Sequence, residues 1–244
     1  MRHWLGFLRS LVIYHNPATM RAWRRFYGDL LDPQDLVLDV GAHVGSRARA
    51  MRAAGARVVA IEPQQPFAGF LRRTLPRDIT LVEAALGRAE TEAEMAVSSR
   101  HPTVSSLRTD FVTGAAHAPG FEHVRWDATQ RVRMVTLDAL IARFGLPRYV
   151  KIDVEGFELD VLSGLSRPVP MLSVEFLPGF VPLTTAVIDR LAELGTYRFN
   201  PVQGETGGFL WSEWRDGAAV KAWLSTLPAD ATSGDLFARL QAPP

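Results

Sequence analysis

Three acidic residues that could carry out chemistry lie near the ends of two apolar runs in this chain. Asp153 ends the run 149–153, Glu155 follows two residues later, and Glu175 lies near the end of the run 170–176. If the runs are neighbouring parallel strands, these carboxylates meet at one edge of a sheet. Carboxylates buried together need a shared proton or a cation. The trio therefore predicts either a general base or a Mg²⁺ site held by Asp153 and Glu175.

Lys151 lies within the run YVKID, where a lysine is unusual and should have a partner. A purely structural interpretation of the acids stays open at this point. Glu155 can cap a helix that starts near residue 157, and Glu175 can pair with an arginine. Lys151 and the trio together favour a catalytic role, so we count Lys151 with the acids as a catalytic candidate.

A glycine turn follows the first apolar run, in the segment VLDVGAHVG at 37–45. Gly41 and Gly45 permit positive φ and close approach of a ligand, so a side chain at Gly41 is expected to fill ligand space or to oppose a positive φ. Glu62 ends the next run, where an acid can accept both hydroxyls of a ribose. The combination indicates an adenosine-containing cofactor. The alternatives are a plain strand-to-helix turn and a solvated glutamate.

The type of cofactor follows from what the glycine turn lacks. His43 and Ser46 stand where a dinucleotide fingerprint would have glycines, and no Gly-Lys-Ser/Thr phosphate loop occurs. S-adenosylmethionine carries a ribose and an adenine but no phosphate, so it tolerates this loop. We therefore predict S-adenosylmethionine. An NAD(P)-dependent oxidoreductase and a non-catalytic nucleotide-binding module are the alternative interpretations.

Histidines are further candidates for the base. A histidine can take a proton near neutral pH, and His43, His101, His117 and His123 all lie in or after the predicted turns and loops. His43 could also approach the methyl-transfer centre. A single histidine is more often structural, so none of them is preferred over the acids.

Strand-length apolar runs alternate with helical patterns, and 47% of the residues are apolar. This alternation predicts an α/β fold with a doubly wound, mostly parallel, Rossmann-like sheet. The predicted strands are 36–40, 56–63, 78–86, 149–153 and 170–176, the predicted helices are 46–55, 66–75, 157–165 and 184–195, and 131–145 is a strand leading into a helix. The stretch up to about residue 97 is expected to be a short hairpin or an edge strand. Residues 197–202 and 207–214 are expected to pair as a terminal antiparallel hairpin, followed by one or two helices.

We expect a helical N-terminal segment at 1–31 and a main domain at 32–244, with a loop or lid insertion at about 98–130. The apolar stretch at the start of the sequence is too short, and too often interrupted, to cross a bilayer. It also lacks a signal-peptide cleavage site. Arginines beside aromatic residues leave peripheral membrane contact through 1–31 open.

Composition narrows the partners and the compartment. The net charge is +1 and the arginines are scattered, which argues against a nucleic-acid partner. The absence of cysteine removes disulfides, thiolate catalysis and cysteine zinc sites, and it fits a reducing, cytoplasmic location.

Taken together, the motifs resemble the FkbM family of S-adenosylmethionine-dependent methyltransferases. The resemblance covers residues 36–176 and weakens beyond them; it rests on DVGAHVG, AIEP, LVEAALG, the Ser-Ser-Leu of 105–107, VTLDAL, YVKIDVEGFELDVLSG and LSVEF, in this order. It implies a class I methyltransferase fold, with a seven-stranded sheet whose last strand is antiparallel. It also implies methyl transfer to a hydroxyl oxygen of a sugar, a glycan or a natural product.

The resemblance further implies which residues bind the cofactor: Asp39, Gly41, His43, Gly45, Glu62, Pro63, Glu83 and Ala84. The sequence departs from the family pattern at His43, where the family usually has Asn. Both side chains donate hydrogen bonds, so cofactor binding should survive the change. The segments before 36 and at 98–130 carry little of the family pattern beyond the Ser-Ser-Leu of 105–107, and they are expected to shape the acceptor pocket.

Overall fold

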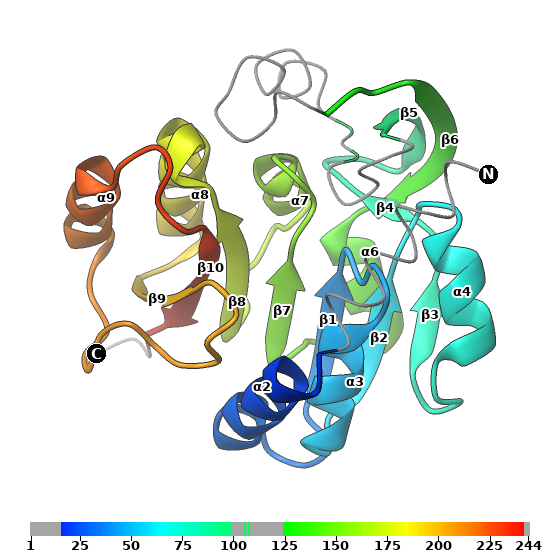
Figure 1. The fold of residues 1–244 in the computed structure, drawn as a ribbon, viewed down its shortest axis with the longest axis horizontal. Coiled ribbons are helices and arrows are strands. Elements are labelled where there is room, and N and C mark those ends of the chain that lie inside the picture. The colour runs from blue at the N-terminus through cyan, green and yellow to red at the C-terminus, as the bar shows by residue number, and fades with distance from the viewer. Residues whose placement is uncertain (1–15, 99–104, 106, 108–123, 242–244) are drawn as a thin grey trace.

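The computed structural model describes residues 16–98, 105, 107 and 124–241 (Figure 1). The predictions for residues 1–15, for most of the insertion at 98–130, and for His101, His117 and His123 lie outside the described residues. The division into 1–31 and 32–244 therefore stays a prediction.

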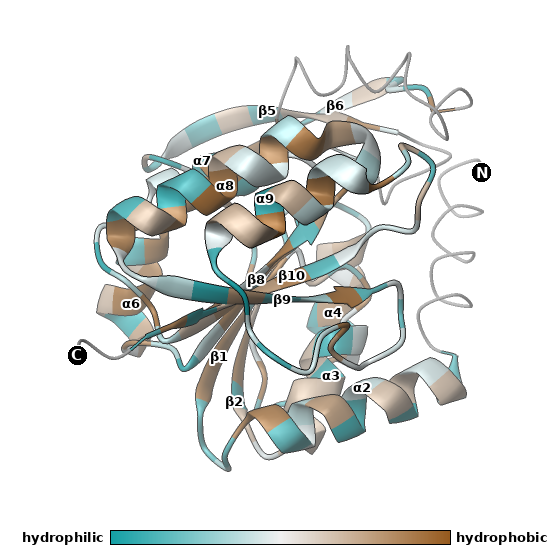
Figure 2. Cartoon of the chain, turned by 90° about the vertical axis from the view of Figure 1, so that its left-hand side faces the viewer, coloured by the Kyte–Doolittle hydropathy of each residue, from teal (hydrophilic) through white to brown (hydrophobic). Residues whose placement is uncertain are grey.

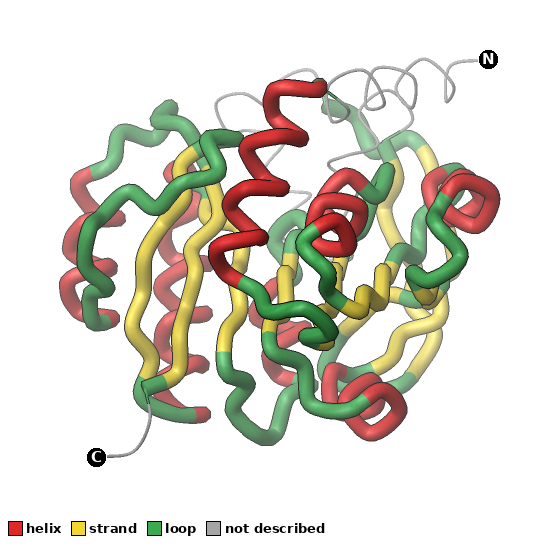
Figure 3. The backbone as a smooth tube through the Cα atoms, turned by 90° about the horizontal axis from the view of Figure 1, so that it is seen from below, coloured by secondary structure: helices red, strands yellow, loops and turns green. Residues whose placement is uncertain are grey.

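A seven-stranded sheet forms the centre of the protein, with its strands side by side between helices (Figure 3). In spatial order the strands are β3 (Thr80–Val82), β2 (Arg57–Ile61), β1 (Leu36–Val40), β7 (Tyr149–Ile152), β8 (Met171–Phe176), β10 (Gly234–Leu240) and β9 (Tyr197–Gln203). The first five are parallel, and β10 runs antiparallel to both of its neighbours. Strands buried on both faces explain the continuous apolar runs in the sequence.

Helices cover both faces of this sheet, as expected for a doubly wound fold (Figure 2). One face packs against α2 (Pro17–Leu30), α3 (Ser46–Ala53) and α4 (Phe67–Thr74). The other face packs against α6 (Leu137–Phe144), α7 (Glu158–Ser163), α8 (Val181–Leu194) and α9 (Gly217–Thr226), with the short 3₁₀ helix η2 (Pro178–Phe180) ahead of α8. Each face buries its own apolar cluster, so the carboxyl edge of the sheet is the place left for a ligand.

A second, three-stranded sheet corrects the prediction of one strand at 78–86. That segment divides into β3 and β4 (Ala85–Leu86), and β4 pairs with β6 (Ala128–Val135), which in turn pairs with β5 (Thr91–Val97). The chain leaves the main sheet at Glu83, where the side chain is exposed. β6 also begins inside the range assigned to the insertion. Apolar content alone does not tell where a run changes sheets, because both halves carry apolar residues although only β4 is fully buried.

The terminal hairpin was predicted with the wrong partner. β9 pairs along its length with β10, and the segment 207–214 contributes no strand, with only one isolated bridge nearby between Phe199 and Arg215. The described chain also closes with a strand rather than a helix. Leu236, Phe237 and Ala238 of β10 are at most 1% exposed and fill the space between β8 and β9. An aromatic-rich segment and a buried strand look alike in sequence, so the pairing depended on which of the two could be buried on both faces.

Helix α2 packs on the main domain through Trp23, Phe26 and Tyr27, which are all buried. Its exposed residues include Arg21, Arg24 and Arg25. The apolar side of α2 is therefore already covered by the protein's own core. Among the residues that the structure describes, no helix combines the length and apolar character needed to cross a bilayer.

The loop after β1 yields the first prediction. Gly41 has a φ of +80°, and a Cβ built there would lie 1.8 Å from the carbonyl oxygen of Asp153. A side chain at Gly41 thus collides with the loop after β7 rather than with ligand space alone. We expect Gly41→Ala to lower the free energy of unfolding by about 3 kcal/mol, since a left-handed Ala costs about 1–2 kcal/mol and overpacking about 1–3 kcal/mol.

Gly28 provides a matched control, because it is an exposed residue of α2 and an added Cβ would meet no atom of the rest of the protein within 4 Å. Gly28→Ala should raise the free energy of unfolding by up to about 1 kcal/mol. Urea denaturation of both variants measures the difference. Equal stability of the two variants would show that the β1 loop yields to a side chain.

Candidate active site

A cavity of about 280 Å³ opens at the carboxyl edge of the main sheet. Its walls come from the loops after β1, β2 and β7, from β8 and the start of β10, and from β4 and β5 of the smaller sheet. The sheet edge brings together segments that are more than a hundred residues apart in sequence. This is the position at which open α/β sheets bind ligands.

The loop after β1 is shaped by three residues with positive φ. Gly41 and Gly45 have φ values of +80° and +77°, and His43 between them has +51°. Only a few residue types other than glycine, chiefly Asn, Asp and His, occupy this region readily. The loop geometry therefore gives a physical reason why a histidine can stand where the family usually has an asparagine. The ring of His43 packs against that of Phe67, with centroids 4.1 Å apart.

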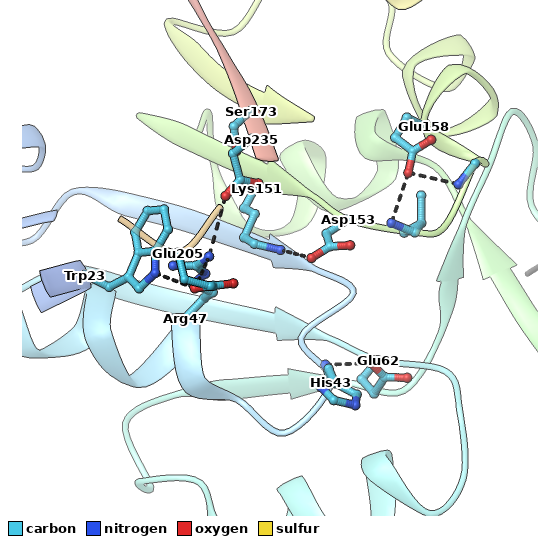
Figure 4. A network of polar contacts seen from close by, with 12 residues as sticks. Trp23, His43, Arg47, Glu62, Lys151, Asp153, Glu158, Ser173, Glu205 and Asp235 are labelled. Carbon is cyan, nitrogen blue, oxygen red and sulfur yellow. Dashed lines mark hydrogen bonds and ion pairs between the residues drawn. The ribbon is translucent and has the colours of Figure 1, made fainter. Parts of the chain in front are cut away.

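Glu62 is held by the backbone of the loops on either side of it. Its Oε2 accepts a hydrogen bond from the His43 N–H at 2.7 Å (Figure 4). Its Oε1 accepts one from the Gln64 N–H at 2.8 Å. The residue is 5% exposed, and burial raises the pKa of its carboxyl to about 7 although the two amides favour the charged form. Each oxygen keeps a lone pair, so the oriented carboxylate fits the two neighbouring hydroxyls of a ribose.

Gln130 supports this cofactor side and was missed in the sequence. Its side-chain oxygen accepts a hydrogen bond from the Gln65 N–H at 2.9 Å, and its Nε2 donates to the Pro63 carbonyl at 2.8 Å. One amide from β6 thus clamps the turn that follows Glu62. Gln130 falls within the predicted insertion, where nothing in the sequence tied it to the loop after β2.

Lys151 is buried and forms an ion pair with the partly exposed Asp153 at the end of β7. The Lys151 Nζ lies 2.7 Å from Asp153 Oδ2, and Lys151 is 2% exposed. Burial disfavours both charges, but their attraction prevails. The pKa of Asp153 is held below its usual value, and Asp153, Asp235 and Asp39 together raise the pKa of Lys151 above its own. The partner expected for Lys151 is therefore Asp153.

Glu155 and Glu175 complete the acidic side of the cavity. Asp153, Glu155 and Glu175 each offer one carboxylate oxygen, and these three oxygens lie within 4.8 Å of one another. Burial, followed by the negative charge of the neighbouring acids, raises the pKa values of Glu155 and Glu175 well above the usual range. Among the described residues Glu175 forms no ion pair with an arginine, and its Oε2 is buried without a hydrogen-bond partner. Glu158 accepts hydrogen bonds from the backbone N–H groups of Val154 and Gly156 in the same loop.

Three of the residues predicted to bind the cofactor do not line the cavity: Asp39, Gly45 and Glu83. Glu83 is exposed and pairs with Arg72 on the outside of α4, so the structure does not bring it to the site. Asp39 lies fully buried in β1, in register with Lys151 of β7. Burial raises the pKa of Asp39, against the charges of Lys151 and Arg47.

A charged residue at the cavity, Arg47, was also missed in the sequence analysis. Arg47, at the start of α3, lies 2.9 Å from Glu205 and 3.6 Å from Asp235, and its guanidinium stacks on the ring of Trp23 at 3.2 Å from the centroid. The Trp23 indole N–H donates to Glu205 at 2.7 Å. Glu205 and Asp235 reach the cavity only through the β9–β10 pairing, so a wrongly paired hairpin left no signal that could place them there.

The strand order, with antiparallel β10 between β8 and β9 and a cavity at the carboxyl edge, is that of class I S-adenosylmethionine-dependent methyltransferases. The model of the methyltransferase FkbM domain matches residues 39–199. The chain therefore belongs to the FkbM methyltransferase family, which confirms the resemblance drawn from its motifs.

Solved structures of similar fold include several methyltransferases. The magnesium protoporphyrin IX methyltransferase of Synechocystis PCC 6803, with bound S-adenosylmethionine, is 12% identical over 96% of this chain and 84% of its own, with a TM-score of 0.46. The O-methyltransferase of Bacillus cereus, in complex with S-adenosylhomocysteine, is 14% identical over 97% and 90%, with a TM-score of 0.45. The precorrin-6y C5,15-methyltransferase of Geobacter metallireducens GS-15 is 14% identical over 92% and 87%, with a TM-score of 0.43. No curated protein matches the sequence.

The ion pair of Lys151 and Asp153 generates a prediction on stability. Lys151→Met leaves Asp153 and Asp39 without their nearest common cation, and breaking a buried pair in this way costs about 3–5 kcal/mol. In the parent protein the lowered pKa of Asp153 contributes stability above its unfolded-state pKa of about 4, and this contribution is lost as the pH falls through the folded-state value. The deficit of the variant should therefore be larger near pH 7.5 than near pH 3, which lies below that unfolded-state value.

Lys221, the other lysine of the chain, is the matched control because its pair with Asp189 is exposed. Lys221→Met should change the free energy of unfolding by no more than about 0.5 kcal/mol. Urea denaturation at the two pH values measures both variants. Similar losses for both lysines would contradict the role assigned to the pair of Lys151 and Asp153.

Proposed function

We propose that this protein transfers the methyl group of S-adenosylmethionine to a hydroxyl oxygen of a sugar, a glycan or a natural product. The observation that carries the proposal is the division of one cavity into two sides. Glu62, oriented by two backbone amides, lies on one side, and the acids Asp153, Glu155 and Glu175 lie on the other. The first side suits a ribose, and the second suits a hydroxyl that must lose a proton.

The acids differ in how well they can take that proton. S-adenosylmethionine supplies a methyl group already activated on a sulfonium, so the protein has to align the acceptor oxygen and remove its proton. Lys151 keeps Asp153 ionised and lowers its affinity for protons. Glu155 and Glu175 have raised pKa values, so each has a higher affinity for a proton than Asp153. As the new O–C bond forms and the S–C bond breaks, the hydroxyl proton passes to this pair of glutamates.

Binding of the cofactor is tested through Glu62. We expect Glu62→Ala to weaken the binding of S-adenosylhomocysteine by about 1–3 kcal/mol, or about 5- to 150-fold in Kd, because charge-assisted hydrogen bonds to the ribose are lost. Glu83→Ala, at the acid that does not line the cavity, should leave the Kd unchanged. Calorimetry measures the Kd of both variants. The same method, applied to NAD binding by the parent protein, separates a methyltransferase from an oxidoreductase. Tighter binding of NAD than of S-adenosylhomocysteine would overturn the proposal.

Turnover is tested through Glu175. Purified protein is incubated with S-adenosylmethionine and a panel of hydroxylated acceptors, and the formation of S-adenosylhomocysteine and of an O-methyl product is followed by mass spectrometry. We expect Glu175→Gln to lower kcat about 100-fold or more, the usual scale for general acid–base help. Formation of an N-methyl or C-methyl product would show that the transfer is not to oxygen. A protein that binds the cofactor but turns over no acceptor would favour the non-catalytic module.

A divalent cation offers a second way to activate the hydroxyl. Three carboxylate oxygens within 4.8 Å of one another suit the oxygen ligands that Mg²⁺ prefers, with Asp153 and Glu175 as the ligands we propose. A bound Mg²⁺ would lower the pKa of the acceptor hydroxyl. Chelation followed by addition of Mg²⁺ decides between the mechanisms. A rate that collapses with chelator and returns with Mg²⁺ supports the metal, and a rate indifferent to chelator supports direct proton removal.

The partners and the location complete the proposal. We propose a small-molecule or glycan acceptor and no nucleic-acid partner, in keeping with a net charge of +1. The absence of cysteine supports a cytoplasmic location. Peripheral membrane contact, if it occurs, would have to come through residues ahead of α2, because the apolar side of that helix is already packed.

A further inference from the structure

We infer that Glu158 is a positioning residue for methyl transfer, holding the loop after β7 in the conformation that presents Glu155 to the cavity. The inference rests on the proposed function for its catalytic consequence. The loop geometry on which it depends can be tested without any acceptor. Nothing in the sequence distinguished Glu158 from an ordinary acid at the start of a helix.

The loop after β7 has a backbone that is costly to maintain. Glu155 has a φ of +54° and Gly156 a φ of +87°, so two consecutive residues are left-handed. Gly156 adopts this conformation freely, but a glutamate there costs about 1–2 kcal/mol. Such conformations persist only where the surrounding structure imposes them. The loop therefore needs contacts that make the alternative conformations of Glu155 less favourable.

Glu158 supplies these contacts from the first turn of α7. A single oxygen, Oε1, accepts hydrogen bonds from the Val154 N–H and from the Gly156 N–H, both at 3.2 Å (Figure 4). The two amides belong to the 153–154 and 155–156 peptide units, so their common acceptor ties together the backbone before and after Glu155. Glu158 is 5% exposed, which leaves little water to replace the bonds if the side chain is removed.

The same loop carries the acid that pairs with Lys151, since Asp153 directly precedes Val154. The Asp153 carbonyl also lies against Gly41 of the cofactor loop. A shift of the loop after β7 would therefore move Glu155 relative to Glu175 before it disturbed the ribose side, where Glu62 is held by other amides. Removal of Glu158 should impair the chemical step more than cofactor binding.

Asp160 is a matched control on the same helix. It pairs with Arg88 on the outer surface and has no hydrogen bond to the loop after β7 among the described contacts. Three substitutions at Glu158 separate position from charge. Glu158→Gln keeps an oxygen at the same reach, Glu158→Asp keeps the charge but draws the oxygen back by one methylene, and Glu158→Ala removes both.

Amide hydrogen exchange tests the loop directly in the full chain by NMR. We expect exchange at Val154 and Gly156 to accelerate about fivefold or more in Glu158→Ala and Glu158→Asp, the scale of one lost hydrogen bond, while Glu158→Gln and Asp160→Ala stay close to the parent. If Glu158→Ala fails to fold, Glu158→Asp carries the test. Unchanged exchange at both amides in Glu158→Asp would overturn the inference.

Kinetics then tests the consequence on an acceptor found in the turnover screen. Glu158→Asp and Glu158→Ala should lower kcat about tenfold or more, with the Kd for S-adenosylhomocysteine changed less than about twofold, and Glu158→Gln should restore most of kcat. Loss of kcat and of cofactor affinity together, or no rescue by Gln, would make Glu158 a structural acid only. If the parent protein turns over no acceptor, the proposed function fails, and hydrogen exchange still decides whether Glu158 holds the loop.

Discussion

The ion pair between the buried Lys151 and Asp153 is the interaction on which the acidic side of the cavity depends. Lys151 comes from the middle of the sheet, in register with Asp39 of β1 and Ser173 of β8. Its ammonium group compensates the charge of several carboxylates, of which Asp153 is directly bonded and Asp39 and Asp235 are close enough to raise its pKa. Without one cation at this point, a sheet with acids on three adjacent strands would bury uncompensated charge.

This pairing also sorts the acids by function. The positive charge of Lys151 stabilises the ionised form of Asp153, so the pKa of Asp153 is lowered and its affinity for a proton is weak. For Glu155 and Glu175, burial and the negative charge of neighbouring acids outweigh any attraction to Lys151 and raise their pKa values instead. A set of similar side chains thus divides into one with a lowered pKa and two with raised pKa values. The division arises from the position of a single lysine.

Much of the fold and part of the site could be predicted, because short local sequence patterns determine them. Continuous apolar runs marked the strands, the glycines at 41 and 45 marked the turn after β1, and Glu62 and Asp153 stood at strand ends where a parallel sheet gathers ligands. The family motifs carried the order of these features, and the family model agrees with them. Each of these signals spans a few residues, so it survives without knowledge of the rest of the chain.

The remainder was decided by tertiary structure, because it depends on which distant segments share a buried space. Burial on both faces selected 234–240 instead of 207–214 as the partner of β9, and this choice brought Glu205 and Asp235 to Arg47. The departure of β4 to the smaller sheet left Glu83 outside the cavity. The hydrogen bonds from two backbone amides to Glu158 require a left-handed conformation at Glu155 between them. The φ of a non-glycine residue cannot be predicted from the sequence. The sequence alone determined which chemical groups stand at the strand ends, whereas long-range packing determined which of them meet and in which direction burial and neighbouring charges shift their pKa values.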